Sequence, residues 1–128
     1  PTNATLNASS GAFAWRPLVT QANTTNLVTL KVADNGTPSL SATQNFSVVV
    51  NPIVSPRASA ALGTNGQFVL TFNGVVGPDY AVQTSTNLVD WQTVFVTNPP
   101  VTPFNWTDTV PTNVPMRFYR AVLGPPWP

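Results

Sequence analysis

Proline and glycine are spread along the whole chain and limit how long any regular element can be. Fourteen prolines and seven glycines divide the 128 residues into short pieces. Proline lacks a backbone donor and breaks helices, and no piece shows the i, i+3, i+4, i+7 apolar spacing of an amphipathic helix. The sequence therefore predicts an all-β protein of short strands with essentially no α-helix.

Apolar residues alternate with other residues in five segments of the second half of the chain, and turn-forming sequences separate them. These segments are 66–74, 79–85, 91–97, 104–108 and 116–123. Short strands at such regular spacing predict an antiparallel β-sandwich. Alternation places one set of large apolar residues on the inner face, and we expect these to form the core: Phe68, Leu70, Phe72, Tyr80, Val82, Trp91 and Phe118.

The first half contains a hairpin signal. Two alternating segments, 27–32 and 45–50, flank Asp34-Asn35-Gly36. Asn and Gly tolerate the positive φ of tight hairpin turns, so we expect a β-hairpin here. A short strand is also expected at 11–15. The two prolines within 51–57 predict a stiff linker between a unit over residues 1–52 and a unit over residues 53–128.

Two motifs connect the chain to known families. The first reads G-x-F-x-W-x-P, then V-x-D-N-G-x-P-x-L-S, then F-x-V-x-V, and its residues are Gly11, Phe13, Trp15, Pro17, Val32, Asp34, Asn35, Gly36, Pro38, Leu40, Ser41, Phe46, Val48 and Val50. In this order, residues 11–52 resemble the C-terminal half of the cadherin-like or immunoglobulin-like repeats of large secreted bacterial proteins.

The second motif reads Y-x-V-Q-x-S-T-N-L-x-x-W, followed by R-F-Y-R. Its residues are Tyr80, Val82, Gln83, Ser85, Thr86, Asn87, Leu88, Trp91, Arg117, Phe118, Tyr119 and Arg120. Residues 66–122 thereby resemble a fibronectin-III-like module found at the C-terminal end of such proteins. Together the resemblances imply two immunoglobulin/fibronectin-III-like β-sandwich units.

The first of these units is expected to be incomplete. The repeat family has several strands before the segment that begins at Gly11, whereas ten residues precede it here. Residues 1–52 can supply about three or four strands, and a sandwich of this type needs about seven. An open apolar face and free strand edges favour association. We therefore expect an assembly interface formed by Phe13, Trp15, Leu27, Val32, Phe46, Val48, Val50 and Trp127, with the 1–10 arm or the 125–128 tail of a neighbour as the added strand.

Few residues can carry chemistry. Charged residues make up 7% of the chain, the formal net charge is +1, and His and Cys are absent. This charge is too small and dispersed for nucleic acid, and general acid–base and nucleophilic catalysis lack their usual groups. We predict no enzyme and no cofactor. A calcium site at Asp34, which the cadherin resemblance implies, competes with the simpler interpretation that Asp34 caps its own turn; hard cations need several carboxylates, so no metal site is predicted.

Other residues leave alternatives open. Asn-x-Ser/Thr sequons make six asparagines candidate glycosylation sites: Asn3, Asn7, Asn23, Asn35, Asn45 and Asn105. A set of aromatic residues could stack on sugars, although core packing competes for Trp15, Trp91 and Tyr80; the full set is Trp15, Tyr80, Trp91, Trp106, Tyr119 and Trp127.

The low charge and the abundance of Thr, Ser, Asn and Val suit a secreted or cell-surface β protein. No apolar run has the length of a membrane span, and the start at Pro1 suggests a processed product or part of a longer protein. The leading hypothesis is a non-enzymatic extracellular structural protein that assembles with itself, into a fibre or surface layer, by strand complementation. The alternative is a carbohydrate-binding or adhesion accessory module of a large secreted protein.

Overall fold

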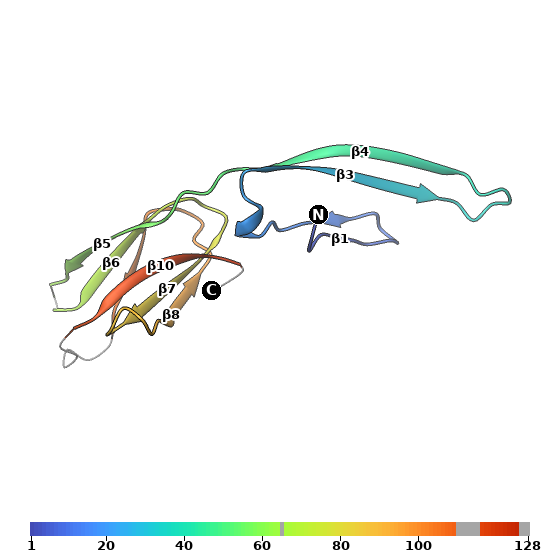
Figure 1. Ribbon diagram of the computed structural model, residues 1–128. Helices are drawn as coiled ribbons and strands as arrows, with labels where there is room; N and C mark the ends of the chain where they lie inside the picture. The colour runs from blue at the N-terminus through green and yellow to red at the C-terminus, as the bar shows by residue number, and fades with distance from the viewer. Residues whose placement is uncertain (65, 110–115, 126–128) are drawn as a thin grey trace. The chain divides into compact units, whose positions relative to one another are not determined.

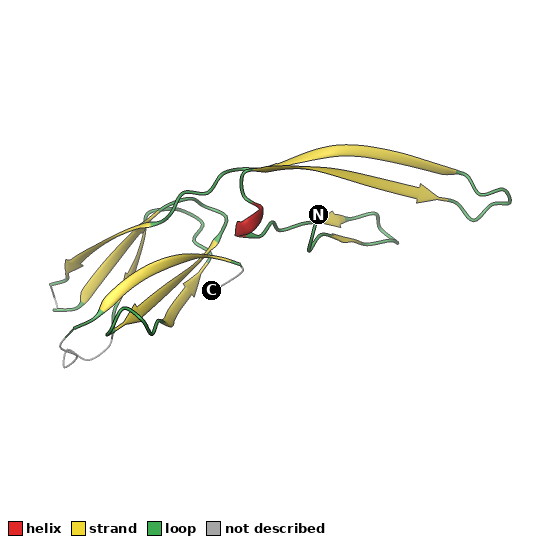
Figure 2. Ribbon diagram, viewed as in Figure 1, coloured by secondary structure: helices red, strands yellow, loops and turns green. Residues whose placement is uncertain are grey.

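The computed structural model describes residues 1–64, 66–109 and 116–125 (Figure 1). The chain divides into two compact units, Pro1–Pro52 and Ile53–Pro128, and each is described by itself. Strands connected by loops make up both units, and the one helical turn in the described part of the chain is the 3-10 turn η1 (Val19–Gln21) (Figure 2). The prediction of an all-β protein is confirmed.

Unit 1 contains a short hairpin and a long one. Strands β1 (Thr5–Leu6) and β2 (Phe13–Ala14) pair antiparallel, and we call residues 1–16 the N-terminal hairpin. Strands β3 (Thr24–Ala33) and β4 (Ser41–Val50) pair over their full ten residues without a register shift. We call this pair the ribbon. Both strands are longer than the sequence predicted, because Thr, Asn and Ser extend the pattern beyond the apolar residues.

The two faces of the ribbon differ in chemistry. Side chains of a strand alternate between faces, and the register sets even-numbered residues opposite even-numbered ones. The even-numbered face, which we call the open face, carries Val28, Leu30, Val32, Ala42, Phe46, Val48 and Val50, together with Thr24, Asn26 and Gln44. The other face carries mostly Thr, Ser, Asn and Lys, with Leu27 and Val49 as exceptions. The ribbon is therefore amphipathic along its length.

The loop between β3 and β4 is held by Asp34. Its Oδ1 accepts hydrogen bonds from the amides of Gly36, at 3.1 Å, and Leu40, at 2.8 Å. The amide of Asp34 donates to the carbonyl of Leu40 at 3.0 Å. Neither Asn35 nor Gly36 has a positive φ, so the prediction of a tight turn with left-handed residues is wrong. A carboxylate that bridges a wider loop does the same work, and the prediction that Asp34 caps its own turn is confirmed.

Unit 2 is a sandwich of two three-stranded antiparallel sheets. One sheet has the order β5–β6–β9, and the other has the order β10–β7–β8. The strands are β5 (Arg57–Leu62), β6 (Phe68–Asn73), β7 (Asp79–Ser85), β8 (Gln92–Thr97), β9 (Phe104–Thr107) and β10 (Phe118–Gly124). All were expected except β5, whose sequence Arg-Ala-Ser-Ala-Ala-Leu lacks the large alternating side chains that mark the others.

Side chains from both sheets form the core of unit 2. Leu70, Phe72, Tyr80 and Val82 are buried, as predicted. Phe95, Phe104, Trp106, Tyr119 and Ala121 pack around the centre of this core. Aromatic contacts bridge the sheets: the rings of Tyr80 and Phe104 lie 5.2 Å apart, and those of Phe95 and Trp106 lie 6.3 Å apart.

Three members of the predicted core lie elsewhere. Phe68 is 52% exposed because it starts β6, opposite the exposed Leu62 at the end of the β5–β6 hairpin. Phe118 is opposite Ser85 on the outer face of its sheet, whereas its neighbour Tyr119 points inward. Trp91 precedes β8 and is covered from outside by Arg120.

Candidate assembly surface

The open face of the ribbon is only partly covered by the rest of unit 1. Phe13 of the N-terminal hairpin contacts Phe46 edge-to-face, with ring centroids 5.8 Å apart. Val28 is the one buried hydrophobic residue among the described residues of this unit. Val32, near the loop end of the ribbon, is 68% exposed, and Phe46 is 36% exposed. The N-terminal hairpin therefore leaves the open face exposed toward the loop end of the ribbon.

A groove lies where the N-terminal hairpin leaves the ribbon. It has a volume of about 490 Å³ and is open to solvent. Its lining includes Leu6, Ala8 and Gly11 from the hairpin and Leu30, Val32 and Ala42 from the ribbon. Asn7, Lys31, Thr43 and Gln44 also line it, so the groove offers both apolar surface and hydrogen-bonding groups to an extended segment.

The predicted interface residues do not all share one surface. Val32, Phe46, Val48 and Val50 lie on the open face, with Val48 and Val50 half-buried. The placement of Leu27 on this surface is wrong. Leu27 lies on the opposite face from Val32 and is 67% exposed, because side chains alternate along an unbroken strand and the two residues are five positions apart. Trp127 lies outside the described residues.

The predicted donor segments also need correction. Residues 1–10 are not an extended arm, since β1 pairs with β2 and the side-chain Nδ2 of Asn3 donates to the carbonyl of Arg16 at 2.6 Å. The indole of Trp15 donates to the carbonyl of Thr2 at 3.1 Å and to Asn3. These bonds tie the arm to its own chain. Within the predicted 125–128 tail, residues 126–128 lie outside the described residues.

Of the aromatic residues considered for sugar stacking, those within the described part of the chain make contacts inside the molecule. Tyr80 is buried and donates to the carbonyl of Val75 at 2.7 Å, while Trp106 packs between Phe95 and Tyr119. The guanidinium of Arg120 lies 4.2 Å from the centre of the Trp91 ring. This guanidinium occupies one face of the Trp91 ring, and a sugar would have to compete with it for that face.

The motif around Trp91 builds a local structure instead. Ser85 Oγ accepts hydrogen bonds from the amides of Asn87 and Leu88, and Leu88 adopts a φ of 64°. The carbonyl of Leu88 then accepts the indole N–H of Trp91 at 3.1 Å. Gln83 accepts from Arg120 at 2.8 Å, which holds the guanidinium over the indole. The spacing of the motif is thus explained by loop geometry.

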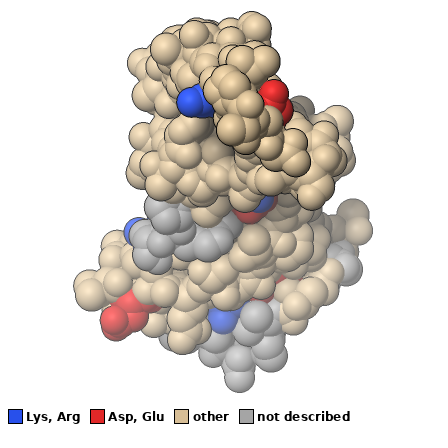
Figure 3. Space-filling view, turned by 90° about the vertical axis from the view of Figure 1, so that its right-hand side faces the viewer, with Lys and Arg blue, Asp and Glu red and all other residues tan. Residues whose placement is uncertain are grey.

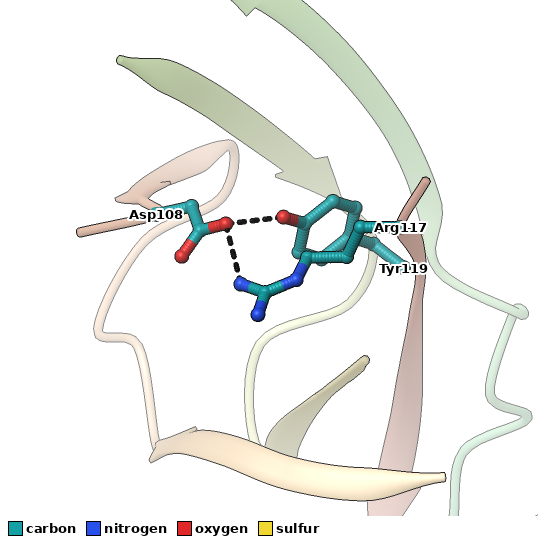
Figure 4. A network of polar contacts seen from close by, with 3 residues as sticks. All are labelled: Asp108, Arg117 and Tyr119. Carbon is teal, nitrogen blue, oxygen red and sulfur yellow. Dashed lines mark hydrogen bonds and ion pairs between the residues drawn. The ribbon is translucent and has the colours of Figure 1, made fainter. Parts of the chain in front are cut away.

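A polar cluster of Asp108, Arg117 and Tyr119 lies at the edge of the unit 2 core (Figure 4). The hydroxyl of Tyr119 donates to Asp108, and Arg117 forms an ion pair with the same carboxylate oxygen at 2.9 Å. Burial, and then the hydrogen bond to Asp108, raises the pKa of Tyr119 above its ordinary value. Burial acts to lower the pKa of Arg117, but its hydrogen bonds to Tyr119 and Asp108 outweigh that effect and raise it. Asp108 thus accepts from both neighbours, while the buried Nε of Arg117 has no hydrogen-bond partner among the described residues.

The remaining predicted sites have simple environments. All six sequon asparagines are exposed, so a glycan could reach each of them: Asn3, Asn7, Asn23, Asn35, Asn45 and Asn105. Among the described residues, no group of three or more His, Cys, Asp or Glu could hold a metal ion. No helix in the part of the chain that the structure describes is long and apolar enough to cross a membrane.

The feature that sequence reasoning missed is the inequality of the ribbon's two edges. Among the strands that the structure describes, β3 and β4 pair only with each other, so each leaves one edge free. Strand β4 reads Ser-Ala-Thr-Gln-Asn-Phe-Ser-Val-Val-Val, with no charge, proline or glycine. Strand β3 carries Lys31. Composition alone could have flagged β4, but the sheet order that leaves it at an edge is not visible in the alternation.

Comparison of the chain with protein-family models, with curated proteins and with solved structures finds no match.

Proposed function

We propose that this chain is a non-enzymatic extracellular structural protein, and that unit 1 is completed by a strand from another molecule. The observation that supports this most is the open face of the ribbon. Val32 is 68% exposed at one end of a mostly apolar face. Fully burying an aliphatic or aromatic side chain contributes roughly 1.5–3 kcal/mol, so covering this face would stabilise the unit measurably.

Strand addition suits the ribbon's chemistry. Both outer edges present backbone groups that no strand of residues 1–64, 66–109 or 116–125 pairs with. An added strand would pair with these groups, while its alternate side chains would enter the groove beside Leu30 and Val32. Low charge works in the same direction, because a net charge of +1 gives little repulsion between copies. On the face drawn in Figure 3, charged atoms are few.

A carbohydrate-binding role has less support from the described residues. Trp91 is capped by Arg120, and Trp106 belongs to the core. The resemblance of residues 11–52 to repeats of secreted proteins and the low charge both suit an extracellular or cell-surface location. Assembly into a fibre or surface layer follows if further contacts join the completed units.

The test is self-association of the chain and its dependence on the open face. Sedimentation velocity over a concentration series, with negative-stain electron microscopy of the concentrated sample, would detect assembly. Val32→Asp places a charge on the open face at a residue that is already exposed. Ala33→Asp adds the same charge at the next residue, which is also exposed but on the opposite face.

We expect the unchanged chain and Ala33→Asp to assemble, and Val32→Asp to assemble more weakly than either. A monomer at every concentration, or equal assembly by both variants, would contradict the proposal.

A further inference from the structure

We infer that the pairing edge is β4, and that its partner is β4 of a second copy related by a two-fold axis. This inference rests on the proposed function, which requires only that some strand be added. It specifies which edge of the ribbon accepts the strand, and which strand arrives. The juxtaposition would make a four-stranded sheet, β3–β4–β4–β3, from two copies of unit 1.

The free edges of the described strands differ in how they are protected. Natural edge strands avoid mispairing by being short, or by carrying charges, prolines or bulges. Strand β9 has four residues, and β8 has a register shift against β7. Strand β5 begins with Arg57, and β10 carries Arg120. Each of these edges thus has a protective feature.

The β4 edge has none of these features. It runs for ten residues, pairs with β3 without a register shift, and contains no charged residue, proline or glycine. The opposite edge of the same ribbon carries Lys31. An edge that is long, regular and neutral is the kind that another strand pairs with.

Charge decides which strand of a second copy fits best. Pairing β3 with β3 would bring two Lys31 side chains to the new junction, and pairing β3 with β4 would bring one. Pairing β4 with β4 brings none. The protected β3 edge also explains why growth would stop at the pair, since a two-fold contact uses the same surface on both copies.

Side-chain parity makes the β4–β4 pair self-complementary. A two-fold axis perpendicular to the sheet sets even-numbered residues opposite even-numbered ones. Phe46, Val48 and Val50 of one copy then extend the open face of the other. The polar face continues in the same way, with Thr43, Asn45 and Ser47 opposite the polar residues of the second strand. The paired sheet stays amphipathic, and its apolar face doubles in width.

The test adds like charges to one edge at a time. The first variant carries glutamate at three exposed polar-face positions of β4: Thr43→Glu, Ser47→Glu and Val49→Glu. The matched variant carries glutamate at three exposed positions of β3 on the same face: Thr25→Glu, Leu27→Glu and Thr29→Glu. Both variants gain the same charge. Whether residue 45, 46 or 47 lies at the two-fold axis, the β4 variant sets introduced carboxylates directly opposite one another.

Sedimentation velocity of the full chain gives the dissociation constant of each variant. We expect the β4 variant to pair at least about tenfold more weakly than the unchanged chain, because like charges directly opposite are destabilising. The β3 variant should differ by no more than about threefold, since its charges lie one strand away from the junction. A third variant with lysine at the same β4 positions should form a mixed pair with the glutamate variant and restore binding.

Four outcomes separate the possibilities. Loss in the β4 variant alone, with recovery in the mixture, supports the inference. Equal loss in both glutamate variants, or loss in the β3 variant alone, overturns the choice of β4 and leaves the proposed assembly standing. Assembly that neither variant affects overturns it in the same way. If the unchanged chain stays monomeric, the proposed function itself fails.

Discussion

Replacing Phe72 by alanine tests the core of unit 2 most severely. Phe72 is fully buried, with 0% of its surface exposed, and it lies between the two sheets of the sandwich. Its ring centroid is 5.4 Å from that of Phe104 in the neighbouring strand. Alanine would remove the whole ring and leave a cavity that strands fixed on both sides cannot fill. Changes of this kind reduce the free energy of unfolding by about 3–5 kcal/mol.

Phe68→Ala is the matched control for this change. Phe68 stands four positions earlier in the same strand and on the same face, but it is 52% exposed. It is not among the residues of the core cluster. We therefore expect Phe68→Ala to reduce the free energy of unfolding by about 1 kcal/mol or less.

Urea denaturation of the full chain, followed by tryptophan fluorescence, measures both changes. Trp106 packs against this core and should report its unfolding. The midpoint should fall in Phe72→Ala with an unchanged slope, as expected when stability alone changes. A loss below about 1 kcal/mol for Phe72→Ala, or an equal loss for Phe68→Ala, would mean that the inner face is wrongly assigned.

Three further predictions concern individual contacts. Gly74→Ala should destabilise unit 2 by about 1–3 kcal/mol in the same urea assay, since a Cβ there would meet the buried Tyr80 hydroxyl, and adding Tyr80→Phe should recover part of the loss. The raised pKa of Tyr119 means that the folded state holds this proton more tightly, so stability present below the ordinary value of 10.0 is lost as the pH rises above it. Urea midpoints at rising pH should fall less steeply for Tyr119→Phe than for the unchanged chain. The hydrogen bonds from the amides of Leu40 and Gly36 lower the pKa of Asp34 below its ordinary value of 3.8, so the loop should loosen only as the pH falls below that value. The NMR chemical shifts of these two amides should change over that pH range in the unchanged chain. They should not change in Asp34→Asn.

Alternation along the strands was enough to predict the fold class and most of unit 2. Strand β7 begins at Asp79 and ends at Ser85, as its sequence indicated. The prediction worked because large apolar residues alternate there and turn sequences flank them. Strand β5 was missed because its alanines and serines carry no such signal; pairing with β6 makes it a strand. Tertiary pairing, which a local pattern does not contain, decides such segments.

The errors in the core have a different origin. Alternation gives the face of a strand but not the length over which two sheets overlap. Phe68 has the right face and lies beyond the packed centre. Phe118 and Tyr119 are adjacent aromatics, so a shift of one residue exchanges which of them points inward. Sequence reasoning favoured Phe118, and the register places Tyr119 in the core.

The candidate surface was predictable in outline and not in detail. Val32 and Phe46 were expected on an open face, and the register places them there. Leu27 was assigned to the same surface although counting positions separates it from Val32. The inequality of the β3 and β4 edges needed the sheet order, because the same ten residues within a sheet would present no free edge.

Hydrogen exchange of the ribbon as a function of protein concentration tests the central claim most directly. A backbone amide at a free edge exchanges with solvent, and a strand that pairs there protects it. If another molecule completes unit 1, outward-facing amides of β4 should exchange more slowly as concentration rises, while those of β9 in unit 2 should not change. Exchange of β4 amides that is the same at every concentration, with Val32 remaining open to solvent, would contradict completion by a second molecule.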